Sequence, residues 1–346
     1  MQTNTHILVI RLSAMGDVAM TIPVIRALAK QHPEIKITFL SKAFLNPLFD
    51  DIPNVHFYAA DVTNTHKGIF GLYQLYKELK QLEITHIADL HNVLRSKILR
   101  SFFKFSSKNI GVIDKGRSEK KALTRTINKV FKQLRTSHER YADVFKKLGF
   151  TIDLSNPIKL EKANLNSSVL NLVGEKKNNW IGIAPFAAYN SKSYPLDLMG
   201  KVIDTLSKKN TVLLFGGGEK EIAILSKIEQ KNEAIISVAG KLNLREELNL
   251  IAHLDCMLAM DSGNAHFAAM LQVKTITLWG ATHPFAGFAP YNQPTENCLL
   301  PDLENYPNIP CSIYGNKVCD GYEDAMRTIL PEKVIEKIET TLKLNS

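Results

Sequence analysis

The chain has 346 residues, more than one hydrophobic core usually organises, so two domains are expected. Its composition, 45% hydrophobic and 22% charged, is that of a globular protein. No apolar run approaches the roughly 20 residues that span a bilayer. The apolar run at the N-terminus soon reaches Arg11, which excludes a signal-peptide pattern. We therefore expect a cytoplasmic protein.

Four cysteines agree with a reducing compartment. Cys311 and Cys319 could bind a metal or each other, but no close pair has zinc-finger spacing. Free thiols are therefore the favoured expectation.

The net charge of +9 is unevenly distributed. Residues 95–147 hold 16 Lys/Arg and 4 Asp/Glu, a balance of +12 (16 − 4), so the remainder is slightly acidic (9 − 12 = −3). The segment is either a solvated helical face or a surface for anionic partners, such as lipid headgroups, nucleic acid or a phosphorylated glycolipid. The second interpretation is favoured.

Short apolar runs alternate with helical patterns along both halves of the chain, which favours parallel sheets covered by helices. Ile22–Lys30 has one apolar helical face, and Pro331–Leu344 is an amphipathic terminal helix. We predict two facing Rossmann-like domains, 1–170 and 171–346, with a terminal helix able to pack back on the first. The predicted strands are His6–Arg11, Ile35–Ser41, Val55–Ala60, Ile84–Leu90, Asn109–Ile113, Trp180–Ala184, Thr211–Phe215, Ala234–Val238, Cys256–Met260 and Thr275–Trp279.

The first strand is followed by Ser13-Ala14-Met15-Gly16-Asp17. A dinucleotide fingerprint would need three glycines there, and this turn has one, which argues against a usual NAD or FAD enzyme. Asp17 is either a helix cap or a general base at the carboxyl end of the strand.

Asp89, His91 and Asn92 stand at the end of the fourth strand of the first half, and Arg95 comes just after it. They stand at the same sheet edge as Asp17 and could bind a sugar or an acid group of an acceptor. Taken singly, each is equally well explained as an ordinary surface residue.

Three strand ends of the second half also carry polar residues. Lys192 follows the first strand, Gly216-Gly217-Gly218-Glu219 the second, and Asp261-Ser262-Gly263 a later one, with His266 one turn into the next helix. A helix N-terminus binds phosphate readily, because unpaired N–H groups and the helix dipole point at it. Each feature alone is compatible with a capped turn, a solvated lysine or a core histidine, but together they predict an anion site at one sheet edge.

These motifs resemble glycosyltransferase family 9, the lipopolysaccharide core heptosyltransferases, over essentially the full chain. The resemblance rests on Ser13–Asp17, Lys192-Ser193-Tyr194-Pro195, Gly217-Gly218-Glu219 and above all Asp261–His266 followed by Leu278-Trp279-Gly280-Ala281-Thr282. It implies the α/β GT-B fold and inverting transfer of a heptose from an ADP-sugar to the inner core of lipopolysaccharide. It also implies that no metal or other cofactor is required.

The resemblance implies a role for each site residue. Asp17 would be the catalytic base. The donor nucleotide-sugar would be bound by Lys192, Glu219, Asp261, Ser262, Gly263 and His266. The phosphorylated glycolipid acceptor would be bound by Ser13, Met15, Gly16, Asp89, His91, Asn92 and Arg95.

Two features leave the substrates open. Ala187-Ala188 stand where some members of the family carry hydroxyl residues, and residues 95–147 are unusually basic. The alternatives are a nucleotide-sugar epimerase of the same fold and a non-catalytic binder of anionic surfaces or nucleic acid. Nucleic acid is disfavoured because aromatic and basic residues do not interleave. Peripheral contact with the anionic inner face of the inner membrane is a further expectation.

Overall fold

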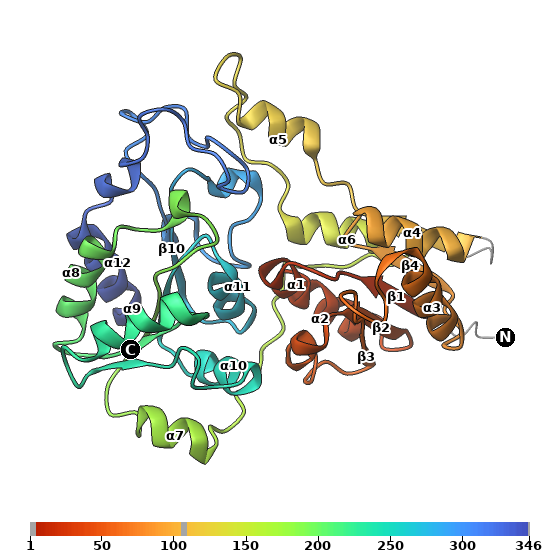
Figure 1. The fold of residues 1–346 in the computed structure, drawn as a ribbon, viewed down its shortest axis with the longest axis horizontal. Coiled ribbons are helices and arrows are strands. Elements are labelled where there is room, and N and C mark those ends of the chain that lie inside the picture. Colours follow the sequence, from red (N-terminus) through yellow and green to blue (C-terminus); the bar gives the residue numbers. More distant parts are fainter. Residues whose placement is uncertain (1–4, 105–108, 345–346) are drawn as a thin grey trace. The chain divides into compact units, whose positions relative to one another are not determined.

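The computed structural model describes residues 5–104 and 109–344, which form two compact α/β units (Figure 1). The first unit contains the chain up to residue 115 and residues 137–159, and the second contains residues 116–136 and everything from 160 onward. The chain therefore passes from the first unit to the second at residue 116 and returns to the first unit at residue 137. The predicted boundary at residue 170 falls inside α7 (Ser167–Val173), a helix of the second unit.

The first unit is built on a five-stranded sheet in the order β3-β2-β1-β4-β5, with every neighbouring pair parallel. The central strand β1 is buried along its whole length, as expected for a strand with both faces covered by helices. The strands are β1 His6–Ile10, β2 Lys36–Ser41, β3 Val55–Ala59, β4 His86–Asp89 and β5 Asn109–Val112.

The second unit is built on a six-stranded parallel sheet in the order β11-β10-β9-β6-β7-β8. Strands β6 and β9 lie at its centre and are fully buried. The strands are β6 Trp180–Ala184, β7 Thr211–Leu214, β8 Ile235–Ser237, β9 Cys256–Met260, β10 Thr275–Leu278 and β11 Cys298–Leu299.

Helices pack beside the sheet of each unit. The α-helices are α1 Met15–Ala19, α2 Ile22–Gln31, α3 Gly68–Lys80, α4 Leu94–Lys104, α5 Arg117–Leu123, α6 Ser137–Lys147, α7 Ser167–Val173, α8 Leu196–Leu206, α9 Glu219–Glu229, α10 Leu244–Ala252, α11 Gly263–Met270 and α12 Pro331–Lys343. Short 3-10 helices are η1 Ala43–Leu48, η2 Asn190–Lys192, η3 Pro284–Ala286, η4 Thr295–Asn297 and η5 Ala325–Thr328.

The predicted fold class is confirmed, and all ten predicted strands are present with small differences at their ends. Continuous apolar runs located them because parallel strands in the middle of a sheet are buried on both sides. The two-residue strand β11 was missed, since two residues give no periodicity. The terminal helix α12 packs on α8 and β9, and Val334 and Ile338 lie in the core of the second unit.

Both sheets reverse their strand order beside a central strand, between β1 and β4 in the first unit and between β6 and β9 in the second. Open α/β sheets bind ligands outside the carboxyl ends of the strands at such a switch point. The fold therefore points to one edge of each sheet.

The segment 116–136 packs on the loop after β10 through a small apolar cluster. Leu123 and Leu134 are buried against Ala286, with Phe285 and Phe288 beside them. The backbone N–H of Leu134 donates to the carbonyl of Phe285 at 2.9 Å. This cluster explains why a segment from the first half of the chain belongs to the second unit.

His283 lies in the same loop and is buried. Its Nδ1 accepts a hydrogen bond from the N–H of Phe285 at 3.1 Å, which requires the neutral ring in this tautomer. Burial, together with the nearby charge of Lys129, lowers the pKa of His283 to about 4.

The low pKa of His283 predicts a loss of stability in acid. His283 takes up a proton near its ordinary pKa of about 6.5 in the unfolded chain and only near 4 in the folded chain. The stability that the neutral His283 ring gives the folded state is therefore complete at neutral pH and is lost as the pH falls from 6.5 to 4. His283→Asn keeps an acceptor oxygen for Phe285 and cannot titrate. Between pH 7 and pH 5, we expect urea unfolding to show the wild type losing about 2 kcal/mol more than the variant. Equal losses would contradict this.

Candidate active site

In the first unit, Asp17 lies beside Arg11 at the carboxyl end of β1. Asp17 Oδ2 lies 2.6 Å from Arg11 Nη2 and accepts a hydrogen bond from the N–H of Ala14 at 3.1 Å. The Asp17 side chain is 32% exposed, whereas that of Arg11 is buried. Arg11 Nη1 also donates to the carbonyl of Leu90 at 2.7 Å, so one guanidinium joins the ends of β1 and β4.

The Asp17 carboxylate is held on one side only. The closest approach of Arg11 and the hydrogen bond from Ala14 are both made to Oδ2, and Oδ1 accepts no hydrogen bond from the described part of the chain. The backbone carbonyl of Asp17 accepts from the hydroxyl of Tyr141 at 3.4 Å, which ties α1 to α6. The arrangement fixes the carboxylate and leaves one oxygen for a ligand.

Asp89 is fully buried and organises the turn after β4. Its Oδ1 accepts from the N–H groups of His91 at 3.0 Å and Asn92 at 2.7 Å, while Oδ2 lies 2.7 Å from Arg100 Nη1. With these partners, the carboxylate of Asp89 shapes the turn rather than facing solvent. Its direct contact with an acceptor stays a prediction.

His91 and Asn92 come close to the end of β1. His91 Nδ1 accepts from the N–H of Leu12 at 3.4 Å, and burial, reinforced by the positive charge of Arg11, lowers the pKa of His91 to about 4. Asn92 donates to the carbonyl of Ile113 at 3.2 Å, while its buried Oδ1 has no partner within the described residues. The ring of His91 is therefore neutral near pH 7.

The other predicted acceptor residues lie on the surrounding turns. Ser13 lies in the turn between β1 and α1, Met15 and Gly16 begin α1 with Met15 exposed, and Arg95 is exposed in the first turn of α4. None of these four side chains forms a hydrogen bond or ion pair with Asp17 among the residues described.

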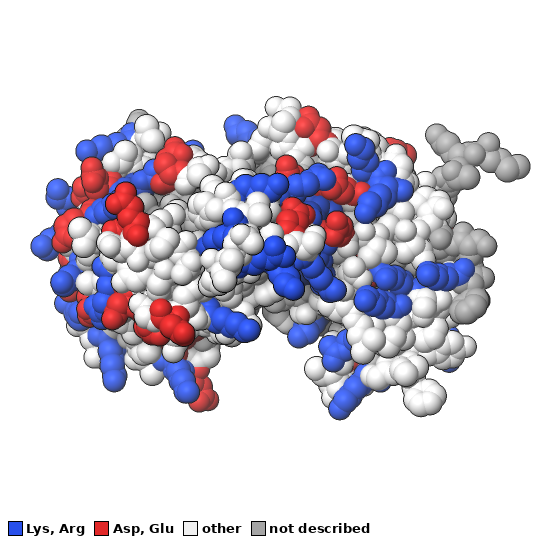
Figure 2. All heavy atoms as spheres, turned by 90° about the horizontal axis from the view of Figure 1, so that it is seen from above, with Lys and Arg blue, Asp and Glu red and all other residues white. Residues whose placement is uncertain are grey.

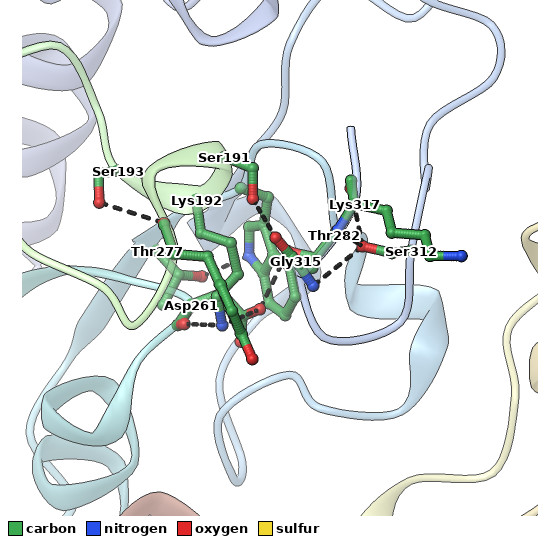
Figure 3. Close-up of polar contacts among 11 residues, drawn as sticks. Ser191, Lys192, Ser193, Asp261, Thr277, Thr282, Ser312, Gly315 and Lys317 are labelled. Carbon is green, nitrogen blue, oxygen red and sulfur yellow. Dashed lines mark hydrogen bonds and ion pairs between the residues drawn. The ribbon is translucent and has the colours of Figure 1, made fainter. Parts of the chain in front are cut away.

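In the second unit, Lys192 and Asp261 form a buried ion pair. Lys192 Nζ lies 3.1 Å from Asp261 Oδ2 and 2.7 Å from the Asp261 carbonyl oxygen. Thr282 donates its hydroxyl to the same Oδ2 at 3.0 Å (Figure 3). These residues follow β6, β9 and β10, so the three strand ends are joined by one carboxylate.

A loop closed by Cys311 and Cys319 packs on this group. The two cysteines form a disulfide with a Cα–Cα distance of 5.3 Å, so the expectation of free thiols was wrong. Spacing could not reveal this, because the intervening loop folds back on itself: Ser312 Oγ accepts from the N–H of Gly315 at 3.0 Å and donates to the carbonyl of Lys317 at 3.0 Å.

Gly315 brings the loop against the lysine. Its carbonyl accepts from the hydroxyl of Ser191 (Figure 3), and its φ of +83° is readily adopted by glycine. A Cβ at this position would lie 2.5 Å from Cγ of Lys192. The absence of a side chain at Gly315 therefore leaves room for the lysine.

The N-terminus of α11 lies directly after Asp261. Ser262 is its N-cap residue, in an extended conformation, and makes no side-chain cap. Its buried Oγ has no hydrogen-bond partner in the described chain, and Gly263 is the first helical residue. The first N–H groups of α11 lack a hydroxyl cap, as an anion site requires. His266 is buried one turn further along the helix.

Glu219 is exposed and begins α9, after the glycine turn that follows β7. Gly218 has a φ of +79°, and the N–H of Gly217 donates to Glu221 Oε2 at 2.8 Å. Because β7, β6 and β9 are neighbours, Glu219 follows a strand end at the same sheet edge as Lys192 and Asp261. The structure shows no direct bond between Glu219 and those two residues.

The predicted donor residues thus follow three adjacent strand ends, and two of them touch. Sequence reasoning missed Arg11, Thr282 and Gly315, although Thr282 lies within a recognised motif and Arg11 ends the first apolar run. Within residues 5–104 and 109–344, there is no cluster of three or more His, Cys, Asp or Glu side chains able to hold a metal ion. No helix in the same ranges is long and apolar enough to cross a membrane.

Comparison with known proteins agrees with this architecture. Residues 72–313, more than half of the chain, match the family model described as glycosyltransferase family 9 (heptosyltransferase). Lipooligosaccharide heptosyltransferase 2 of Campylobacter jejuni is 23% identical over 343 residues, 95% of this chain and 96% of that protein.

Two solved structures have the same fold. A family 9 glycosyltransferase of Veillonella parvula superposes with a TM-score of 0.77 at 21% identity, covering 99% of this chain and 98% of the other. ADP-heptose lps heptosyltransferase II of E. coli gives 0.72 at 19% identity, covering 99% of each chain. The two parallel sheets are those of a GT-B enzyme. The protein belongs to glycosyltransferase family 9, the heptosyltransferases.

Proposed function

We propose that this protein is an inverting glycosyltransferase that moves a heptose, or a closely related sugar, from an ADP-sugar to the inner core of lipopolysaccharide. Membership of family 9 supports the transferase chemistry, and the names of the similar proteins support the sugar, the nucleotide and the lipid-linked acceptor. The observation that carries the proposal is the arrangement after β9, where Lys192 donates to the carbonyl of Asp261 and the uncapped start of α11 follows directly in the chain.

The donor diphosphate would bind at the start of α11. The uncapped N–H groups of Gly263 and its neighbours and the unpartnered hydroxyl of Ser262 are donors for phosphate oxygens. Lys192 adds a positive charge, although in this structure its ammonium is bound to Asp261. Glu219, after the neighbouring strand β7, would accept hydrogen bonds from ribose hydroxyls.

The transfer would be a single displacement at the anomeric carbon. The acceptor hydroxyl oxygen forms the new glycosidic bond while the bond from that carbon to the β-phosphate oxygen breaks, so ADP leaves with the electron pair. The hydroxyl proton passes to Asp17, whose Oδ1 accepts no hydrogen bond in the part of the chain described. Lys192 and the α11 dipole stabilise the charge on the departing diphosphate. Arg11 keeps Asp17 in place.

The role of Asp17 predicts a selective loss of turnover. Asp17→Asn keeps the size of the side chain and removes the base, so kcat should fall by about two to four powers of ten. Binding of the ADP-sugar, measured by calorimetry, should persist. Glu34→Gln, an exposed carboxylate changed to an amide in the same unit, is the matched control. Unchanged turnover in Asp17→Asn would remove this residue from the mechanism.

The unpartnered hydroxyl of Ser262 predicts opposite effects on stability and binding. Ser262→Ala removes a group that makes no bond in the free protein, so Tm without ligand should not fall. If the hydroxyl donates to the diphosphate, affinity for ADP should drop at least tenfold, as expected for a hydrogen bond to a charged group. Ser237→Ala is the control, because that buried hydroxyl also lacks a partner among the described residues and lies on β8, three strands from β9.

The nucleotide class of the donor is tested by measuring Tm in the presence of different nucleotides and nucleotide-sugars. The proposal predicts that ADP and ADP-sugars raise Tm more than the UDP and GDP compounds at equal concentration, because only the bound form gains stability from ligand. Stabilisation by UDP-sugars alone would contradict the proposed donor.

We further propose that no metal is required, because Lys192 and the α11 N-terminus already supply positive charge at the leaving group. Turnover should therefore survive excess EDTA. Loss of turnover in EDTA that added Mg²⁺ restores would show that this charge is insufficient.

A further inference from the structure

The segment 116–136, here called the basic hairpin, is a separate feature of the second unit. It runs out along α5 (Arg117–Leu123) and turns back, and the N–H of Val130 donates to the carbonyl of Ala122 at 3.0 Å. Figure 1 shows the helix and the returning limb side by side. Leu123 and Leu134 fasten the base of the hairpin to the loop after β10.

The outer part of the basic hairpin exposes aliphatic and aromatic side chains. Ile127, at the turn, is 78% exposed, and Val130 and Phe131 are 43% and 45% exposed. Phe131 packs one edge on His283 and Phe285, with ring centroids 5.0 and 5.1 Å away. Phe131 is therefore held in place by its ring neighbours, while Ile127 stands exposed at the turn.

Basic side chains surround these apolar groups. The segment contains seven Lys/Arg and one acid, Glu119, a balance of +6 (7 − 1). Five of the seven are exposed, namely Arg117, Lys121, Arg125, Lys132 and Arg135. Figure 2 shows Lys and Arg side chains in the middle of the face viewed from above, with Asp and Glu side chains among them.

The remaining two lysines stabilise the hairpin itself. Lys120 is buried with its Nζ 4.2 Å from the ring centroid of Phe288. Lys129 Nζ donates to the carbonyl of Ile309 at 2.8 Å, and burial lowers the pKa of Lys129 to about 8. The hairpin is thus braced against residues 283–309, between Thr282 and the disulfide loop of the donor site.

We propose that the basic hairpin docks this protein on an anionic lipid bilayer, with Ile127 entering the boundary between headgroups and acyl chains. Lys and Arg attract anionic headgroups, and apolar side chains among them gain from leaving water at that depth.

A bilayer fits this surface better than a nucleic acid. Base stacking requires exposed aromatic rings, and the one aromatic residue of the hairpin, Phe131, already packs against two rings. Ile127 and Val130 are aliphatic and offer no stacking surface. Docking on a bilayer does not require the proposed function to be correct. The proposed function supplies only its purpose, which is to hold the donor-binding unit at the membrane that carries a lipid-linked acceptor.

The first test measures binding of the full-length chain to vesicles of phosphatidylcholine with and without 30% (about one third) phosphatidylglycerol, by sedimentation at physiological salt. We expect binding to the anionic vesicles only. Ile127→Asn should weaken it about tenfold, and Arg125→Gln with Lys132→Gln should weaken it at least as much, since each basic group near the surface is worth about fivefold.

Two matched variants control for general loss of apolar or basic surface. Phe70→Asn removes a side chain on α3 that is 92% exposed, and Lys208→Gln with Lys209→Gln removes two exposed charges after α8. Both should bind like the wild type. Absence of vesicle binding, or equal loss in the control variants, would overturn the proposal. Hairpin-dependent binding of an RNA oligonucleotide without vesicle binding would assign the surface to nucleic acid instead.

Insertion is tested with Ile127→Trp. The two native tryptophans, Trp180 and Trp279, are buried, so a new signal from position 127 is distinguishable. Anionic vesicles should shift its emission to the blue, and lipids brominated on the acyl chain should quench it. Binding without either change would mean surface adsorption alone and would contradict insertion.

Activity separates this inference from the proposed function. With a lipid-free, water-soluble acceptor, the hairpin variants should turn over like the wild type, whereas with acceptor in vesicles they should be slower by the factor lost in binding. Absence of transfer in every assay, with hairpin-dependent vesicle binding intact, would refute the enzyme assignment and leave the docking surface standing. Equal activity of all variants on vesicle-bound acceptor would refute docking.

Discussion

The contact of Lys192 with Asp261 is the interaction on which the second unit's site depends. A buried ammonium bonded to both the carboxylate and the carbonyl of one residue leaves little freedom to either loop. Removing one partner of a buried pair leaves an uncompensated charge, at a typical cost of about 3–5 kcal/mol. Thr282 adds a third strand end to the same carboxylate, so the loops after β6, β9 and β10 keep one arrangement.

Close backbone approach makes this arrangement possible. A Cβ on Gly280 would lie 2.2 Å from the carbonyl oxygen of Ser191, which accepts a hydrogen bond from the N–H of Ala281 at 2.9 Å. The first unit uses a similar device at its own switch point. There, Arg11 is the buried cation, and it connects the end of β4 with the carboxylate of Asp17. In each unit a cation at the strand-order reversal holds an acid in place.

Much of this could be predicted from sequence, because both the strands and their ends have local signals. Buried parallel strands are continuous apolar runs, and parallel strands bring the residues that follow them to one edge, which is why Lys192 and Asp261 were expected together. The role of Asp89 could not be read in this way. Its partner Arg100 lies on the following helix, and only the fold shows that the carboxylate is enclosed.

The features that the sequence analysis did not predict depend on contacts between residues whose positions only the fold determines. The bond between Cys311 and Cys319 depends on the shape of an irregular loop, which spacing does not determine. The assignment of residues 116–136 to the second unit depends on Leu123 and Leu134 meeting Ala286, more than 150 positions later in the chain for each of them (286 − 134 = 152). Helical periodicity indicates that such residues will be buried, but it does not identify the residues they pack against.

The excursion of residues 116–136 means that the polypeptide passes between the units three times, after residues 115, 136 and 159. A gene fragment starting at residue 160 would therefore encode a C-terminal half without residues 116–136. Phe285 and Phe288 would then lack the two leucines, Leu123 and Leu134, that pack with them. The halves are not interchangeable modules, and recombination between relatives would preserve this apolar contact only if both sides were inherited together.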